Sequence, residues 1–306
     1  MTTNHVVDRT AILLLLVLCV FWGLQQVAIK LALDSVSPIM QAALRSIVAV
    51  FLLSLWMRWK GIGIFQKDGA EWWGILAGLL FTAEFALLYW SLEYTTASRA
   101  IVFLYMSPFV VALGMHWFVP SERFRLLQII GLCCAFSGIV IAFMNDANSH
   151  EKSWLGDLMA IAAAVLWGSM TVVVKASPQR HLRAEKVLFY QLGVSAVLLP
   201  FCSVLSGEAG IIELNQVAMM SLLFQAVIVA FISYVAWYWL IHHYPASKIT
   251  PFGFMTPLLG VFFGYLILDE AISGSFIIAL LLVAIGIFLI NKQPAPAKKI
   301  NKKTAQ

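Results

Sequence analysis

The stretch FWGLQQVAIK at residues 21–30 occurs a second time, as LWGSMTVVVK at residues 166–175. Both copies hold a Trp-Gly pair with a lysine seven residues after the glycine. The matched positions are Trp22 with Trp167, Gly23 with Gly168, and Lys30 with Lys175. The chain therefore contains a candidate internal repeat with a spacing of 145 residues.

A second pair of matching stretches follows in the same order. YWSLEYTTASRAIVFLYMSP at residues 89–108 corresponds to YWLIHHYPASKITPFGFMTP at residues 238–257, at a spacing of 149. The order is preserved and the spacing changes little, so we infer that the chain arose by duplication.

The composition predicts that both copies lie in a membrane. Of the 306 residues, 61% are hydrophobic and 11% charged, whereas a soluble domain is about half apolar and about a quarter charged. Ten long apolar runs follow one another, and ten helices of ~20 residues would leave room only for short connections. The runs lie at approximately 11–33, 37–57, 72–91, 97–118, 125–145, 155–175, 186–205, 215–241, 248–268 and 274–291. We predict an all-α membrane protein with ten transmembrane helices.

The charges predict the topology. If the N-terminus is cytoplasmic, 16 of the 20 Lys and Arg residues fall in cytoplasmic segments, and most carboxylates fall in the opposite gaps. This sorting predicts a multi-pass protein of the inner membrane with both termini in the cytoplasm. Five helices per repeat is an odd number, so the second copy must be inverted relative to the first. We expect a first repeat at 1–146, a second at 147–292 and a basic cytoplasmic tail at 293–306.

Taken together, these motifs resemble the EamA domain, the ten-helix branch of the drug/metabolite transporter superfamily. The resemblance rests on the duplicated Trp-Gly and Lys positions, on Ser37-Pro38 followed by Arg45, and on the Ala-Ser-Arg/Lys and Met-Ser/Thr-Pro elements. It implies a carrier of small metabolites, with a central cavity built mainly from helices one, three, four, six, eight and nine. The aromatic and neutral amino-acid exporters of the YddG type offer the functional analogy. The second repeat departs from the pattern, because its second helix has Tyr190 and Gln191 but no clear arginine.

Glu84 is the main candidate for a transport role. It lies near the middle of the third apolar run, where a carboxylate is costly unless it is paired, protonated or hydrated. It could hold the amino group of a substrate or exchange a proton. The alternative is a structural carboxylate paired with a donor on another helix.

Further candidates are aromatic and amide side chains within the predicted spans. Most membrane aromatics pack or lie at the interfaces, but Trp22 and Trp167 are repeat-related and each precedes a glycine. Amide side chains in spans need partners and could bind substrate or simply link helices. The complete set of predicted substrate-binding residues is Trp22, Gln26, Glu84, Tyr105, Trp167, Gln225, Tyr234 and Trp237.

Other residues in the spans have structural interpretations. Arg45 and Lys30 are interpreted as tying helix ends or binding lipid phosphate. Pro108 and Pro257 are symmetry-related, and each removes a backbone hydrogen bond, so they could kink their helices and serve gating. The spacings of Gly74 with Gly78 and of Gly260 with Gly264 predict close helix packing.

The sequence shows no sign of an enzyme. It has no Walker A motif, no Ser-His-Asp pattern and no ligand set for a metal. Its four cysteines lie in apolar runs and are interpreted as packing residues. We therefore expect no catalytic residues, no metal and no cofactor.

The leading hypothesis is a secondary transporter that exports small metabolites, amino acids above all, by alternating access between the repeats. A broad-specificity drug or nucleoside exporter is the alternative, and a non-transporting membrane scaffold is an alternative of another class. The expected partners are a small-molecule substrate and membrane lipid, with no nucleic acid. A monomer would be sufficient, and a dimer is possible.

Overall fold

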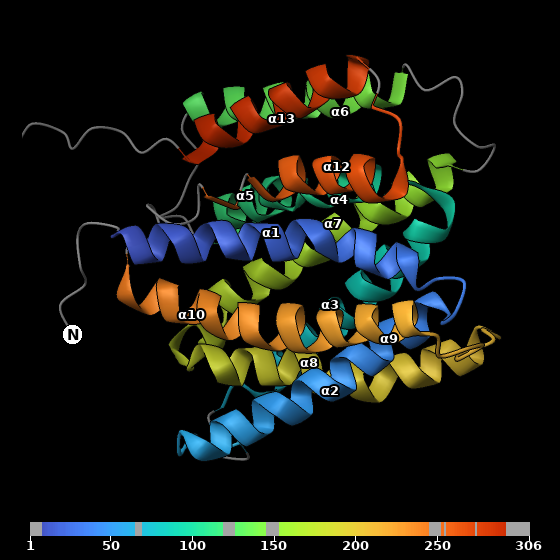
Figure 1. Cartoon of the computed structure of the whole chain (residues 1–306). Coiled ribbons are helices and arrows are strands. Elements are labelled where there is room, and N and C mark those ends of the chain that lie inside the picture. Colours follow the sequence, from blue (N-terminus) through green and yellow to red (C-terminus); the bar gives the residue numbers. More distant parts are fainter. Residues whose placement is uncertain are drawn as a thin grey trace, which may run out of the picture.

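The chain folds into a bundle of helices (Figure 1). The computed structural model describes residues 8–64, 69–118, 126–144, 153–244, 252–253, 255–272 and 274–291. Its elements are α1 (Arg9–Leu31), α2 (Pro38–Trp59), α3 (Glu71–Tyr94), α4 (Ala97–Leu104), α5 (Ser107–Phe118), α6 (Leu126–Met144), α7 (Ser153–Ala176), η2 (Pro178–His181), α8 (Ala184–Leu205), α9 (Gln216–Leu223), η3 (Phe224–Ser233), α10 (Tyr234–His243), α12 (Met255–Leu268) and α13 (Gly274–Asn291). The predicted tail at 293–306 lies outside the described residues.

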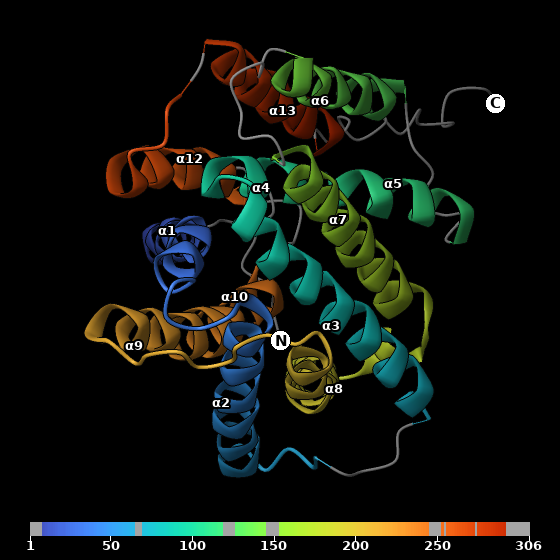
Figure 2. The ribbon, with the colours of Figure 1, turned by 90° about the vertical axis from the view of Figure 1, so that its right-hand side faces the viewer.

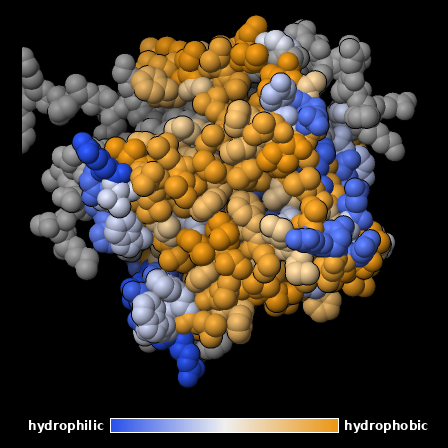
Figure 3. Space-filling model, viewed as in Figure 1, coloured by the Kyte–Doolittle hydropathy of each residue, from blue (hydrophilic) through white to orange (hydrophobic). Residues whose placement is uncertain are grey.

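Seven segments within the described residues are long and apolar enough to cross a membrane. One of them joins α4 to α5, and another runs from α9 through η3 into α10. The space-filling view shows apolar side chains over the middle of one face, with hydrophilic residues toward its two sides (Figure 3). The prediction of an all-α membrane protein is confirmed, while the number of ten spans stays a prediction.

Helices from the first half of the chain pack against helices from the second half. Helix α1 contacts α12, and its repeat counterpart α7 contacts α5. Helix α6 pairs with α13, and α2 pairs with α8, as both ribbon views show (Figures 1 and 2). Each half therefore buries its apolar faces against the other.

Glycines mark the places where two helices approach most closely. A β-carbon at Gly78 of α3 would lie 2.6 Å from Val194 and 2.9 Å from the carbonyl of Tyr190, both on α8. A β-carbon at Gly260 of α12 would lie 2.5 Å from Ile101. The close packing predicted from the two small-residue spacings is confirmed.

Alanine at Gly78 should destabilise the bundle. The added methyl group would collide with α8, and overpacking of this kind costs about 1–3 kcal/mol. Gly193 is the matched control, because it lies within α8 and a β-carbon added there would have no atom within 4 Å. Thermal unfolding in detergent should show a lower melting temperature for Gly78→Ala and no decrease for Gly193→Ala. Equal decreases in both variants would contradict the packing argument.

The fourth predicted span is broken near its middle. Helix α4 ends at Leu104, and α5 starts at Ser107, so Pro108 lies in the first turn of α5. A proline there removes no helical hydrogen bond, because the first N–H groups of a helix have no partner within it. Pro257 is likewise in the first turn of α12. Pro108 thus lies just after the break in the fourth span, and Pro257 lies in the first turn of α12. Their roles in kinking and gating stay a prediction.

Candidate functional site

Two oppositely charged side chains are buried near each other between α2 and α3. Arg45 of α2 is 1% exposed and Glu84 of α3 is 3% exposed. They lie within electrostatic range of each other, yet Nε and Nη2 of Arg45 and Oε2 of Glu84 have no hydrogen-bond partner among the described residues. The site therefore combines a guanidinium group and a carboxyl group, both with unused hydrogen-bonding capacity.

Aromatic side chains surround the arginine. Its guanidinium carbon lies 3.9 Å from the centroid of the Phe85 ring, which is a cation–π geometry. The hydroxyl groups of Tyr89 and Tyr234 also lie close enough to interact with the guanidinium electrostatically. Phe85 and Tyr89 come from α3 and Tyr234 from α10, so two helices besides α2 position this cation.

Gln225 belongs to a hydrogen-bonded chain beside this pair. Tyr89 donates to the amide oxygen of Gln225 over 2.6 Å, and the amide nitrogen of Gln225 donates to the Gln41 oxygen over 3.1 Å. Gln41 in turn donates to the carbonyl of Val36 over 2.9 Å. Since its amide already has protein partners on both sides, Gln225 links helices in this conformation and positions Tyr89. Gln26 of α1 differs, because it is buried and its amide oxygen has no hydrogen-bond partner among the described residues.

Gln225 lies in η3, which is a π-helix of ten residues. Segments of π-helix are rare and often coincide with functional sites. Ser233 closes the segment and accepts a hydrogen bond of 2.8 Å from the indole of Trp22. The sequence shows no signal for this irregular turn geometry.

Trp22 packs against two other aromatic residues of the predicted site. Its ring centroid lies 5.5 Å from that of Trp237 and 6.5 Å from that of Tyr234. All three rings are half-buried. Because Tyr234 also approaches Arg45, this aromatic group is continuous with the charged pair.

Tyr105 and Trp167 form another aromatic pair, with ring centroids 5.8 Å apart and nearly perpendicular planes. The Tyr105 hydroxyl is close enough to the Tyr234 hydroxyl for an electrostatic interaction between them. The structure thus brings Trp22, Tyr234 and Trp237 into contact and places Tyr105 and Trp167 as a second pair near them.

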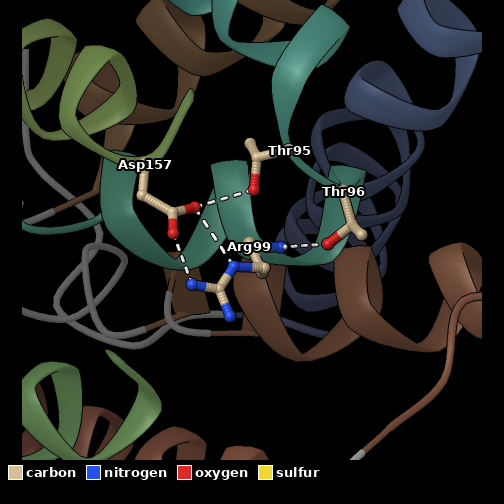
Figure 4. Close-up of polar contacts among 4 residues, drawn as sticks. All are labelled: Thr95, Thr96, Arg99 and Asp157. Carbon is tan, nitrogen blue, oxygen red and sulfur yellow. Dashed lines mark hydrogen bonds and ion pairs between the residues drawn. The ribbon is translucent and has the colours of Figure 1, made fainter. Parts of the chain in front are cut away.

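A buried ion pair between Arg99 and Asp157 lies at one end of the bundle. We call this end of the bundle the Arg99 end. Nε of Arg99 in α4 donates to Asp157 of α7 over 3.1 Å, and Nη2 donates to the other carboxylate oxygen (Figure 4). The Thr95 hydroxyl adds a hydrogen bond of 2.7 Å to Asp157. Lys30 at the end of α1 donates to the Thr95 carbonyl over 2.6 Å, which matches its interpretation as a residue that ties helix ends.

Two more carboxylates close the same end by capping helices. Glu270 accepts from the backbone N–H groups of Ala97 and Ser98, at 2.7 and 2.9 Å, and so caps α4. Glu208 accepts from the N–H groups of Ile39 and Met40, at 3.0 and 3.2 Å, and so caps α2. Carboxylates at helix N-termini satisfy free N–H groups and the helix dipole. Both caps connect residues of one half of the chain to a helix of the other.

At the opposite end of α1, Asp8 ties the start of this helix to the end of α10. Its carboxylate accepts hydrogen bonds from the Ala11 N–H over 2.8 Å and from the Tyr244 hydroxyl over 2.9 Å. These bonds, the first above all, lower the pKa of Asp8. The carboxylate therefore stays ionised and keeps its cap at neutral pH.

Arg45 is the main residue whose role the sequence does not indicate. Its complete burial leaves no surface for a lipid phosphate, and it lies in the third turn of α2. Its position in the motif after Ser37-Pro38 is visible in the sequence, but its neighbours Glu84, Phe85 and Tyr234 come from distant parts of the chain. Within the described residues, no group of three His, Cys, Asp or Glu side chains could hold a metal ion.

Known proteins resemble this chain over most of its length. The model of the EamA-like transporter family matches residues 9–144 and again residues 154–292. The "Uncharacterized transporter YoaV" of Bacillus subtilis is 26% identical over 88% of this chain and 92% of its own length. The "Probable amino-acid metabolite efflux pump" of Escherichia coli K12 is 23% identical over 90% of this chain and 93% of its own length.

A solved crystal structure has the same fold. It aligns with a TM-score of 0.67, covering 92% of this chain and 96% of its own, at 18% sequence identity. The whole bundle, and not one part of it, therefore matches a structure seen before.

Proposed function

The chain belongs to the EamA-like transporter family, and from that membership we propose that it is a secondary transporter that exports small metabolites, amino acids above all. Its many apolar helices make it a multi-pass membrane protein. We place it in the inner membrane with both termini in the cytoplasm, because the basic residues are sorted to that side of the predicted spans.

The observation that carries the proposal is the buried, incompletely paired Glu84 near Arg45, which aromatic side chains surround. Charged groups inside a membrane protein are expensive, and they mark substrate or ion pathways. Oε2 of Glu84 has no hydrogen-bond partner among the described residues, so a substrate ammonium group or a proton would complete the site. Trp22, Tyr234 and Trp237 would contact the apolar part of the substrate.

Alternating access would expose this site to one side of the membrane at a time. In the present structure, polar contacts across both halves of the chain hold the Arg99 end together. The predicted topology places this end on the non-cytoplasmic side of the membrane. Export would then require these contacts to open, after the substrate has entered from the cytoplasm.

The relatives favour amino acids as the substrate class. Proteins of Escherichia coli and Salmonella typhimurium that match 90% of this chain carry the name "Probable amino-acid metabolite efflux pump". The aromatic surroundings of Glu84 fit amino acids with apolar or aromatic side chains. Drugs and nucleosides are the competing class, because an aromatic lining also suits them.

A ligand screen on the purified protein tests this assignment. A ligand that binds the folded state raises its stability by RT ln(1 + [L]/Kd), which is about 2.7 kcal/mol at one hundred times Kd. We expect neutral and aromatic L-amino acids to raise the melting temperature in proportion to the logarithm of their concentration. Stabilisation by nucleosides or cationic drugs but not by amino acids would contradict the substrate class. Flat melting curves with all three classes would favour a scaffold over a carrier.

A further inference from the structure

The atoms that are left unpaired in the buried charged pair form a specific pattern. Nε and Nη2 of Arg45, both without a hydrogen-bond partner among the described residues, lie on the same edge of the guanidinium group. The N–H groups on this edge are parallel, and their spacing matches the two oxygens of a carboxylate. Oε2 of Glu84, also without a partner within the described part of the chain, is an acceptor for an ammonium group.

From this pattern we propose that Arg45 and Glu84 form a bipolar site for the zwitterionic head group of an α-amino acid. Arg45 binds the α-carboxylate through its Nε–Nη2 edge, and Glu84 binds the α-ammonium group. The proposal rests on the proposed transport function and adds to it the part of the substrate that the site recognises. Arg45 thereby becomes a specificity-determining residue.

The surroundings fix the orientation of the guanidinium group. The Phe85 ring lies against one face of Arg45 at 3.9 Å, so the planar group is fixed, while its Nε–Nη2 edge has no hydrogen-bond partner in the part of the chain that the structure describes. Tyr89, which approaches Arg45, is itself anchored to Gln225 over 2.6 Å. Nε and Nη2 of Arg45 do not pair with Oε2 of Glu84, although both residues are almost fully buried.

An alternative interpretation is a structural ion pair, and this chain offers one for comparison. Arg99 and Asp157 are also buried, and there the same nitrogen atoms, Nε and Nη2, bind both carboxylate oxygens. The Nε–Nη2 edge of Arg99 is thus hydrogen-bonded to a carboxylate of the protein. The same edge of Arg45 has no partner among the described residues. Leaving buried charges unpaired costs free energy, and a bound zwitterion would remove that cost at both charges at once.

Binding of three related probes tests the proposal. L-phenylalanine carries both head groups, 2-phenylethylamine lacks the carboxylate, and 3-phenylpropionate lacks the ammonium group. Melting temperatures of the purified full-length protein, measured over a range of probe concentrations, give the relative affinities. We expect wild-type protein to bind phenylalanine at least about tenfold more tightly than either of the other probes.

Two variants separate the roles of the charges. Arg45→Lys keeps the positive charge but removes the fork, so it should weaken phenylalanine and phenylpropionate binding by about tenfold and leave phenylethylamine unchanged. Glu84→Gln should weaken phenylalanine and phenylethylamine and leave phenylpropionate unchanged. Arg183→Lys is the matched control, since the Arg183 side chain is 62% exposed, and it should bind all three probes as the wild type does.

The outcomes show whether the bipolar site alone is wrong or whether the proposed transport of amino acids is wrong as well. If wild-type protein binds phenylalanine but binds one of the two analogues equally well, the bipolar site is wrong and the carrier proposal stands. The same conclusion follows if Arg45→Lys weakens all three probes alike. If phenylalanine does not stabilise the wild-type protein at all, the amino-acid proposal itself is overturned. The wild-type comparison decides the question even if Arg45→Lys fails to fold.

Discussion

Alanine in place of Asp157 should lower the free energy of unfolding by about 3–5 kcal/mol, the cost of breaking a buried ion pair by removing one partner. The Asp157 side chain is 0% exposed and the Arg99 side chain 10%. Without the carboxylate, the guanidinium loses its fork of two hydrogen bonds in a place that water reaches poorly. Thr95 would lose a bond of 2.7 Å as well.

Thermal and denaturant unfolding of the purified protein would measure this effect. The matched control is Glu185→Ala, which removes a carboxylate 3.9 Å from the exposed Arg183 and should cost less than about 1 kcal/mol. A double variant in which leucine replaces both Arg99 and Asp157 should be more stable than Asp157→Ala alone, because no unpaired charge remains. Equal stability of Asp157→Ala and wild type would show that the pair is not formed.

Glutamine in place of Glu84 should reduce the transport rate by about 10- to 100-fold. This factor corresponds to the free energy lost with one hydrogen bond to a charged group. Stability should not fall in parallel. The carboxylate is buried with one oxygen unpaired among the described residues, so a neutral amide of the same size should lower the melting temperature much less than Asp157→Ala does. This separation of activity from stability distinguishes a substrate site from a structural carboxylate.

The measurement is uptake of labelled phenylalanine by proteoliposomes, with Glu185→Gln as the control for the same substitution at a position outside the site. Repeating it between about pH 6 and pH 8 tests whether Glu84 also exchanges a proton. Transport that depends on pH in the wild type but not in Glu84→Gln would support this role. Wild-type activity of Glu84→Gln would exclude Glu84 from the site.

Much of the fold follows from local features of the sequence. Apolar runs long enough to span a membrane predict helices, and the glycine spacings predict where those helices touch, as Gly78 and Gly260 show. The motif repeat also indicates that the two halves are related. The break between α4 and α5 and the π-helical η3 are not evident from the sequence, because they depend on packing between distant segments.

The site can be predicted only in part for the same reason. Glu84 stands out because a carboxylate in the middle of an apolar run is conspicuous by itself. From the sequence, Arg45 is interpreted only as a structural residue. A single sequence does not show that Phe85 and Tyr234 contact it in the folded protein. Asp157 lies inside α7 and binds Arg99 of α4, a pairing between distant segments that the sequence does not show.

The central claim is that the protein carries amino acids across a membrane through a buried site that opens to each side in turn. Counterflow tests it most directly: proteoliposomes loaded with unlabelled L-phenylalanine are diluted into a trace of labelled L-phenylalanine. A carrier with alternating access exchanges the two, so we expect a transient accumulation of label above its equilibrium level. Label that never exceeds the level in protein-free liposomes would contradict the claim.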